Sequence, residues 1–92
     1  MASTVVHRSK RFEKDLDSLP DPIRTKAIVW VNFVETLGLL ELRKRAGYHD
    51  EPLKGERKGQ RSVRLNKAYR LIYTEVDEHH EIFLKEITKH EY

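Results

Sequence analysis

The sequence predicts a single α+β domain, residues 1–92, in which two helices cover one face of a small antiparallel sheet. Three observations support this class. The chain has 92 residues, enough for one modest core. Apolar residues follow a helical period in the first half, and β-forming residues flank turn residues in the second half. The expected order of elements is β-α-α-β-β-β.

The chain is expected to begin with a short strand and an amphipathic helix. Residues 4–7 include a β-branched run that favours a strand, and Ser9 is a suitable N-cap for the helix that follows. Pro20 ends this helix. Its apolar residues fall on one face: Phe12, Leu16 and Leu19.

A longer helix follows, with Asp21 as the expected N-cap and Pro22 as its first residue. Gly38 is expected to interrupt or bend this helix, and Gly47 marks its end. Its main apolar stripe consists of Ile23, Ala27, Trp30, Val31, Val34 and Leu37. A further set widens this stripe and predicts a fully core-facing helix: Ile28, Val29, Phe33 and Leu40.

The second half changes to the period of a sheet. Residues 48–60 contain Pro52, two glycines and few apolar side chains, so we expect a loop there. Alternating or β-branched runs separated by turn residues then predict two successive hairpins. The expected strands are residues 62–65, 69–74 and 81–88.

Positive charge is concentrated in the middle of the chain, although the net charge is only +3. Residues 43–70 carry ten basic side chains against three acidic ones, whereas residues 71–92 are acidic. Such a surplus favours a polyanion, so an RNA or DNA backbone is the first ligand to consider, with a protein interface as the alternative. The side chains expected to contact the backbone are Lys54, Arg57, Lys58, Arg61 and Lys67.

Composition excludes several classes of site. The chain contains no cysteine, which excludes disulfides and a thiol nucleophile and indicates a reducing compartment. No apolar run approaches the roughly 20 residues that cross a bilayer, and the N-terminus lacks a signal-peptide core, so we expect a cytoplasmic protein that binds no membrane. His79 and His80 are adjacent in a charged turn and lack spaced ligands, so no metal or cofactor is expected.

Five residues in and after the basic stretch have side chains suited to chemistry on a phosphodiester. Glu51 is a carboxylate at the edge of the basic loop and could act as a base. Arg64 and Arg70 lie in one predicted hairpin, where antiparallel pairing would bring two guanidinium groups together to bind a phosphate. His90 offers a proton donor, and Tyr92 offers a ring that can stack on a base. Taken singly, each also fits an ordinary structural role.

The second half also carries an ordered series of short motifs. They are EPLKG at residues 51–55, GQRSVRL at 59–65 and YRLIY at 69–73, followed by a C-terminus with His90 and Tyr92. The series resembles the RelE/ParE superfamily of toxins from type II toxin–antitoxin systems, with YoeB, HigB and RelE mRNA interferases as the nearest branch. The resemblance covers roughly the last 45 residues as motifs, and the first half agrees in pattern only.

This resemblance implies an endoribonuclease that cuts mRNA in the ribosomal A site, without metal or cofactor. The 2′-hydroxyl of the RNA would attack the adjacent phosphate and expel the 5′-oxygen, leaving a cyclic or 3′-phosphate end. Glu51 matches the general base of the family, Arg64 and Arg70 match its phosphate-binding arginines, and Tyr92 matches its terminal tyrosine. The implied partners are mRNA, ribosomal RNA and a cognate antitoxin that holds the toxin inactive in a hetero-oligomer.

The C-terminus departs from the family pattern. YoeB-like chains end in His-Tyr, whereas Glu91 here separates His90 from Tyr92, so the general acid is either His90 or another group. Two other functions stay open: ParE-like relatives inhibit DNA gyrase, and a non-catalytic RNA-binding module needs only the basic surface. The acid–base set favours the nuclease, because an inhibitor has no use for it.

Overall fold

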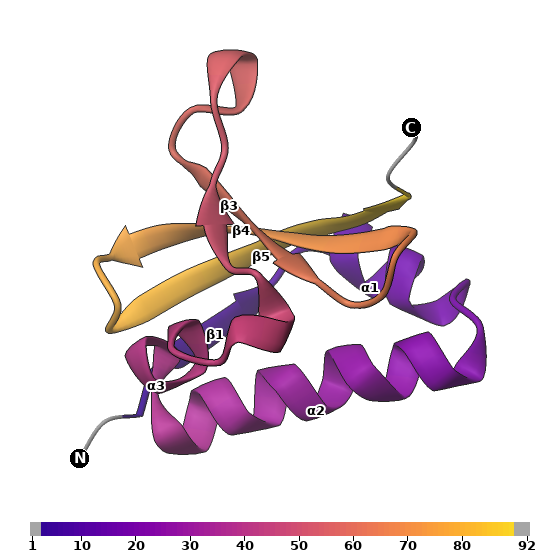
Figure 1. The fold of residues 1–92 in the computed structure, drawn as a ribbon, viewed down its shortest axis with the longest axis horizontal. Coiled ribbons are helices and arrows are strands. Elements are labelled where there is room, and N and C mark those ends of the chain that lie inside the picture. Colours follow the sequence, from indigo (N-terminus) through magenta and orange to yellow (C-terminus); the bar gives the residue numbers. More distant parts are fainter. Residues whose placement is uncertain (1–2, 90–92) are drawn as a thin grey trace.

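The computed structural model describes residues 3–89 and shows a five-stranded sheet with helices on one side (Figure 1). The helices are α1 (Lys10–Asp17), α2 (Asp21–Leu37) and α3 (Leu39–Arg43), and two 3₁₀ turns are η1 (Ala46–Tyr48) and η2 (Gly55–Arg57). The strands are β1 (Val5–Arg8), β2 (Glu51–Pro52), β3 (Gln60–Arg64), β4 (Tyr69–Asp77) and β5 (Glu81–Lys89).

The predicted α+β class is confirmed, and the sheet is antiparallel except at one edge. Its strand order is β1-β5-β4-β3-β2. The strands β3, β4 and β5 form consecutive antiparallel pairs, whereas β1 runs parallel to β5. A parallel pair needs a long connection, and here the helices and the other strands all separate β1 from β5 along the chain.

Ser9 begins α1 and also attaches this helix to the sheet. Its Oγ accepts a hydrogen bond from the Phe12 backbone N–H at 2.9 Å, as an N-cap does, and donates to the Lys85 carbonyl of β5 at 2.6 Å. Asp15 accepts a bond from the Ile87 backbone N–H at 3.0 Å. Both contacts lie beside the irregularity where the β4–β5 pairing skips Lys85, so α1 stabilises the bulged part of β5.

The N-terminus of α2 lies one residue earlier than the sequence predicts. Pro20, and not Asp21, is the N-cap. The Pro20 carbonyl accepts hydrogen bonds from the backbone N–H groups of Ile23 and Arg24, each at 3.0 Å. A proline lacks the N–H but keeps this acceptor, so the helix can begin directly after it.

The predicted interruption at Gly38 is confirmed. Gly38 adopts φ 90° and ψ 150°, which ends α2 and begins α3. The Leu39 backbone N–H donates to the Thr4 hydroxyl oxygen at 2.9 Å, and this hydroxyl donates to the His79 carbonyl at 2.8 Å. The helix break is thereby held against both the start of β1 and the β4–β5 turn.

The core lies between the helices and one face of the sheet. Trp30 and Val34 of α2 are fully buried, and the ring centroid of Trp30 lies 5.6 Å from that of Tyr73 on β4. The sheet contributes Val63, Leu71, Ile82 and Leu84 to the core, and Ile87 joins them beyond the bulge at Lys85.

The expectation that α2 faces the core on all sides is wrong. Ile28, Val29 and Phe33 of α2 are 36%, 37% and 38% exposed, and Leu40, which lies in α3, is 45% exposed. The helices form a single layer, so only the face of α2 that contacts the sheet is buried. Within residues 3–89, no helix has both the length and the apolar character that a membrane span requires.

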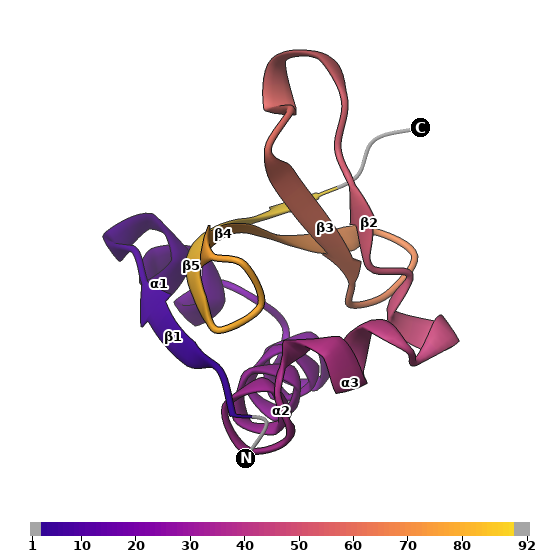
Figure 2. The ribbon, with the colours of Figure 1, turned by 90° about the vertical axis from the view of Figure 1, so that its left-hand side faces the viewer.

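The loop expected at residues 48–60 contains a short edge strand. Glu51 pairs with Ser62 and Pro52 pairs with Arg61, which adds β2 to the sheet beside β3. Proline is tolerated there because an edge strand leaves one side of its backbone unpaired. The remainder of the segment, residues 53–59, projects away from the helices (Figures 1 and 2). The pairing fixes the register of Glu51, a predicted site residue.

Candidate active site

One face of the sheet is not covered by the helices. Successive residues of a strand point to opposite faces. Leu71 and Tyr73 are buried in the core beneath β4, so Arg70, Ile72 and Thr74 point to the other side. We call this side the open face.

A groove of about 340 Å³ lies on the open face. Glu51 is exposed at its edge, whereas Ser62 and Ile72 are only 5% and 4% exposed. The groove therefore brings together Glu51, the predicted base, and Arg70, one of the two predicted phosphate ligands. The complete lining is Glu51, Leu53, Arg57, Ser62, Arg70, Ile72 and Thr88.

Arg64 and Arg70 lie directly opposite each other in the β3–β4 pair, as antiparallel pairing predicts. Arg70 Nη1 donates to the Asn66 carbonyl at 2.9 Å and to the Tyr69 carbonyl at 3.3 Å. Arg64 Nη1 lies 3.3 Å from Nε2 of His49. Like charges directly opposite each other destabilise a sheet, and a bound anion would relieve this repulsion. The pair is therefore suited to a phosphate.

Arg57 reaches the groove from the projecting segment. Its Nη2 lies 3.1 Å from Glu86 Oε2 on β5, and its Nη1 donates to Gln60 Oε1 at 2.8 Å. These partners hold the Arg57 guanidinium over the open face. Its position fits a contact with the backbone of a ligand in the groove.

The other predicted RNA-binding cations occupy three different places. Lys54 and Lys58 are exposed in the projecting segment, and Lys67 is exposed in the β3–β4 turn. Arg61 lies on the opposite face of β3 from the groove, because it pairs with Tyr73 of the core face. Arg61 is therefore separated from the other four cations.

A buried ionic network beneath the sheet explains the position of Arg61. The Asp50 side chain is only 1% exposed. Its carboxylate accepts hydrogen bonds from the Tyr73 hydroxyl at 2.6 Å and from Arg61 Nε at 2.7 Å. Arg43 Nη2 lies 2.9 Å from Glu75 Oε1 and 3.3 Å from the Tyr73 hydroxyl oxygen. Burial, and then the Asp50 carboxylate, raise the pKa of Tyr73 far above its usual value. The network fixes the chain at Asp50, directly before Glu51.

Asp50 and His49 are not among the site residues that the sequence predicts. Asp50 is one of only three acidic residues within residues 43–70, which was the available signal for a structural role. His49 has φ 45° and ψ 48°, a left-handed conformation that histidine adopts more readily than most residues. The sequence gives no sign that His49 contacts Arg64, because this contact depends on the pairing of β2 with β3.

No protein-family model and no curated protein sequence matches the chain. Solved structures match it over nearly its whole length. YafQ from E. coli strain BL21(DE3) has a TM-score of 0.74 at 21% identity, covering 95% of this chain and 93% of that one. The archaeal RelE–RelB complex from Pyrococcus horikoshii OT3 has a TM-score of 0.72 at 22% identity, covering 95% of this chain and 94% of that one. The RelBE2 toxin–antitoxin complex from Mycobacterium tuberculosis has a TM-score of 0.66 at 26% identity, covering 97% of this chain and 100% of that one.

This chain has a RelE-like toxin fold. The resemblance inferred from the motifs at residues 51–73 is therefore confirmed at the level of the fold. In this RelE-like chain, the three motifs form β2, the projecting segment and the β3–β4 hairpin around the groove. His90 and Tyr92 lie outside the described residues, and their roles stay predictions.

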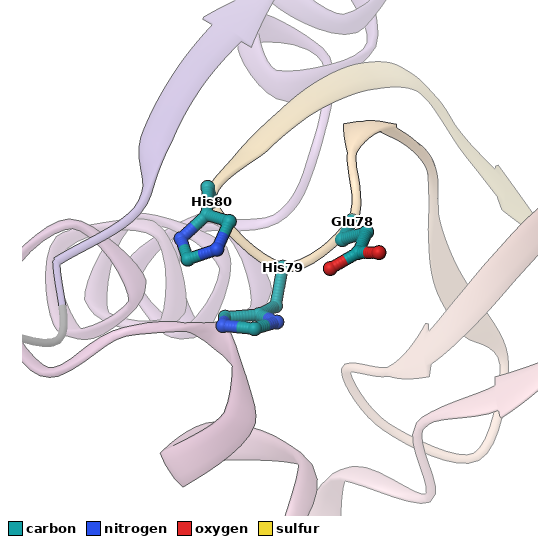
Figure 3. A group of neighbouring side chains, drawn as sticks. All are labelled: Glu78, His79 and His80. Atoms are coloured by element: carbon teal, nitrogen blue, oxygen red, sulfur yellow. The ribbon is translucent and has the colours of Figure 1, made fainter.

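Glu78, His79 and His80 form a group of potential metal ligands whose donor atoms lie within 4.8 Å of one another (Figure 3). They are consecutive residues of the β4–β5 turn, and the two imidazole centroids are 4.1 Å apart. Arg70 lies at the other end of β4, about 23 Å away along an extended strand. This cluster is therefore separate from the groove.

Proposed function

We propose that this chain is the toxin of a toxin–antitoxin system and that it cleaves mRNA in the ribosomal A site as a metal-independent endoribonuclease. One observation carries the proposal: Glu51 and Arg70 share a groove on the open face, and Arg64 lies directly opposite Arg70. A carboxylate base and two phosphate-binding guanidinium groups are two of the three components that cleavage by a 2′-hydroxyl requires, and the third is a general acid.

The reaction begins with a phosphodiester bound at the Arg64–Arg70 pair. Glu51 takes the proton of the 2′-hydroxyl as this oxygen attacks phosphorus, and the arginines stabilise the charge that develops on the phosphoryl oxygens. The bond to the 5′-oxygen breaks as a general acid protonates this oxygen, giving a 2′,3′-cyclic phosphate and a 5′-hydroxyl. The buried Asp50 holds Glu51 in register, so the base is positioned before the RNA binds.

Four cations extend the proposed RNA surface beyond the scissile phosphate. Arg57 lies in the groove, Lys54 and Lys58 lie in the projecting segment, and Lys67 lies in the β3–β4 turn. Such side chains contribute to affinity by displacing counterions from phosphates. We leave Arg61 out of this surface, because its guanidinium is paired with buried Asp50.

The proposed partners are mRNA, ribosomal RNA and a cognate antitoxin, and the toxin acts in the cytoplasm where these meet. The matching solved structures include the RelBE2 toxin–antitoxin complex and the archaeal RelE–RelB complex, which supports an antitoxin partner in a hetero-oligomer. The proposed general acid is His90 or another group, and Tyr92 is proposed to stack on the substrate base.

The test is cleavage of a short message positioned in the A site of purified ribosomes, with the cut and the new 3′ end mapped for wild type and Glu51→Gln. We expect a cut with a cyclic or 3′-phosphate end in the wild type and a loss of about 10²-fold or more in Glu51→Gln. An unaffected Glu51→Gln variant would indicate a binding module without acid–base chemistry. Absence of any cut by a protein that is toxic in cells would favour a gyrase inhibitor of the same fold.

A further inference from the structure

His49 lies at the Arg64–Arg70 pair although it belongs to neither strand of this hairpin. Its Nε2 is 3.3 Å from Nη1 of Arg64, and Arg64 is directly opposite Arg70. His49 is exposed to solvent. An imidazole therefore lies within reach of any phosphate that the two arginines bind.

Buried Asp50 explains why His49 and Glu51 are held on the same side of the sheet. The Asp50 carboxylate points into the core, where it binds the Tyr73 hydroxyl and Arg61. Its neighbours are directed elsewhere: Glu51 lines the groove, and His49 contacts Arg64. The His49 backbone is further fixed by its N–H, which donates to the Ala46 carbonyl at 3.1 Å. The two titratable residues therefore flank one rigid anchor.

We propose that His49 is the general acid that protonates the leaving 5′-oxygen, an inference that rests on the proposed function. In an in-line displacement, the attacking and leaving oxygens lie on opposite sides of phosphorus, so the base and the acid must flank the phosphate. Two residues separated by one other residue have Cα atoms at most about 7 Å apart, whatever the conformation of the chain between them. This spacing lets Glu51 contact the 2′-oxygen and His49 the 5′-oxygen of a phosphate bound by the arginines.

The protons balance over one cleavage. The bond from the 2′-oxygen to phosphorus forms as Glu51 accepts the hydroxyl proton, and the bond from phosphorus to the 5′-oxygen breaks as the His49 imidazolium donates its proton to that oxygen. Glu51 ends protonated and His49 ends neutral, and exchange with water restores both. The contact with Arg64 gives way during binding, since the phosphate replaces Nε2 as the partner of the guanidinium N–H groups.

The test compares two substrates in the ribosomal assay: a message with the ordinary scissile linkage and one in which sulfur replaces the 5′-oxygen. A thiolate leaves without being protonated, so loss of a general acid should matter only for the oxygen substrate. The variant is His49→Asn, because asparagine tolerates the left-handed backbone but carries no transferable proton. His79→Asn, on the distant β4–β5 turn, is the matched control.

We expect His49→Asn to cleave the oxygen substrate about 10²-fold more slowly than wild type and the sulfur substrate at nearly the wild-type rate. His79→Asn should resemble wild type on both substrates. His49→Gln provides a second variant, and circular dichroism establishes that each is folded.

Three results would overturn the assignment. Normal cleavage of both substrates by His49→Asn would show that His49 is dispensable. Equal losses on both substrates in His49→Asn would show that His49 only positions Arg64. If instead only His90→Asn cleaves the oxygen substrate slowly and the sulfur substrate normally, the general acid is His90. In each case the wild type still cleaves RNA and the proposed function stands. A wild type that cleaves neither substrate would remove the proposed function and this inference together.

Discussion

Tyr73 illustrates how one buried side chain connects the core to the site. Its ring is fully buried beside Trp30, and its hydroxyl donates to the Asp50 carboxylate at 2.6 Å. Removing the Tyr73 proton would place a second negative charge beside Asp50 in the interior. Burial and this carboxylate therefore hold the pKa of Tyr73 far above its usual value of about 10.

Stability should consequently fall as the pH rises above about 10. The unfolded chain releases the Tyr73 proton there while the folded chain keeps it, so the unfolded state binds fewer protons and becomes favoured. We expect the urea midpoint to decrease between about pH 9 and pH 11, and to decrease less steeply in Tyr73→Phe. Tyr48→Phe, at a half-exposed tyrosine outside this network, is the control. The same steepness in Tyr73→Phe and wild type would contradict this account.

The groove arginines should differ in their effect on catalysis. Arg70 lies opposite Arg64 and shares the groove with Glu51, whereas Arg57 is paired with Glu86 at 3.1 Å. Arg70→Ala should reduce single-turnover cleavage by about 10²-fold or more, and Arg57→Ala by less than about tenfold. Equal losses would mean that both arginines supply only a general positive potential.

At the scale of elements, α1 is attached to β5 by side chains as well as by apolar packing. Ser9 and Asp15 both bind backbone groups of β5 beside its bulge. A bulge leaves backbone groups without their usual ladder partners, and side chains from a neighbouring helix can satisfy them. The helix and the irregular strand therefore depend on each other.

Ser9→Ala should lower the free energy of unfolding by about 1 to 2 kcal/mol, because it removes both the helix cap and the bond to the Lys85 carbonyl. Ser18→Ala is the matched control at the other end of α1, where the hydroxyl is exposed and donates to the Asp15 carbonyl. It should change stability by less than about 0.5 kcal/mol. Urea denaturation measures both, and equal effects would show that the β5 contact contributes nothing.

At the scale of the whole molecule, the charge surplus of residues 43–70 is divided between two faces. Arg64, Arg70 and the cations of the projecting segment lie on or around the open face. Arg43 and Arg61 instead neutralise buried or half-buried carboxylates on the core face. The first set and Lys67 of the β3–β4 turn are available to a polyanion, whereas Arg43 and Arg61 are not.

The salt dependence of RNA binding should reveal this division. The logarithm of the affinity for a short single-stranded RNA should fall linearly with the logarithm of salt concentration, with a slope of about −0.7 per phosphate contacted. Lys58→Gln should reduce the steepness by about 0.7, whereas Arg61→Gln should leave the slope unchanged and lower thermal stability. Lys10→Gln on α1 controls for net charge in this fluorescence anisotropy titration. A flatter slope in Arg61→Gln would place that side chain on the RNA.

The sequence by itself determined the class of the fold and most of the elements. The periods of the apolar residues, the Ser9 cap and the break at Gly38 are local signals, and they identified α1, the end of α2 and the two hairpins. The six-residue spacing of Arg64 and Arg70 across a predicted turn was sufficient to place them together, because a hairpin fixes its own register.

Only the tertiary structure decided which residues face which side and which distant segments meet. The exposure of Phe33 and Leu40 depends on the helices forming one layer, which no local period specifies. The edge strand at Glu51, the burial of Asp50 and the contact of His49 with Arg64 arise from contacts between segments 11 to 23 residues apart, whose register no turn of defined type dictates. Long-range pairing and burial are properties of the assembled chain, and they placed the candidate base, the phosphate ligands and His49 on one surface.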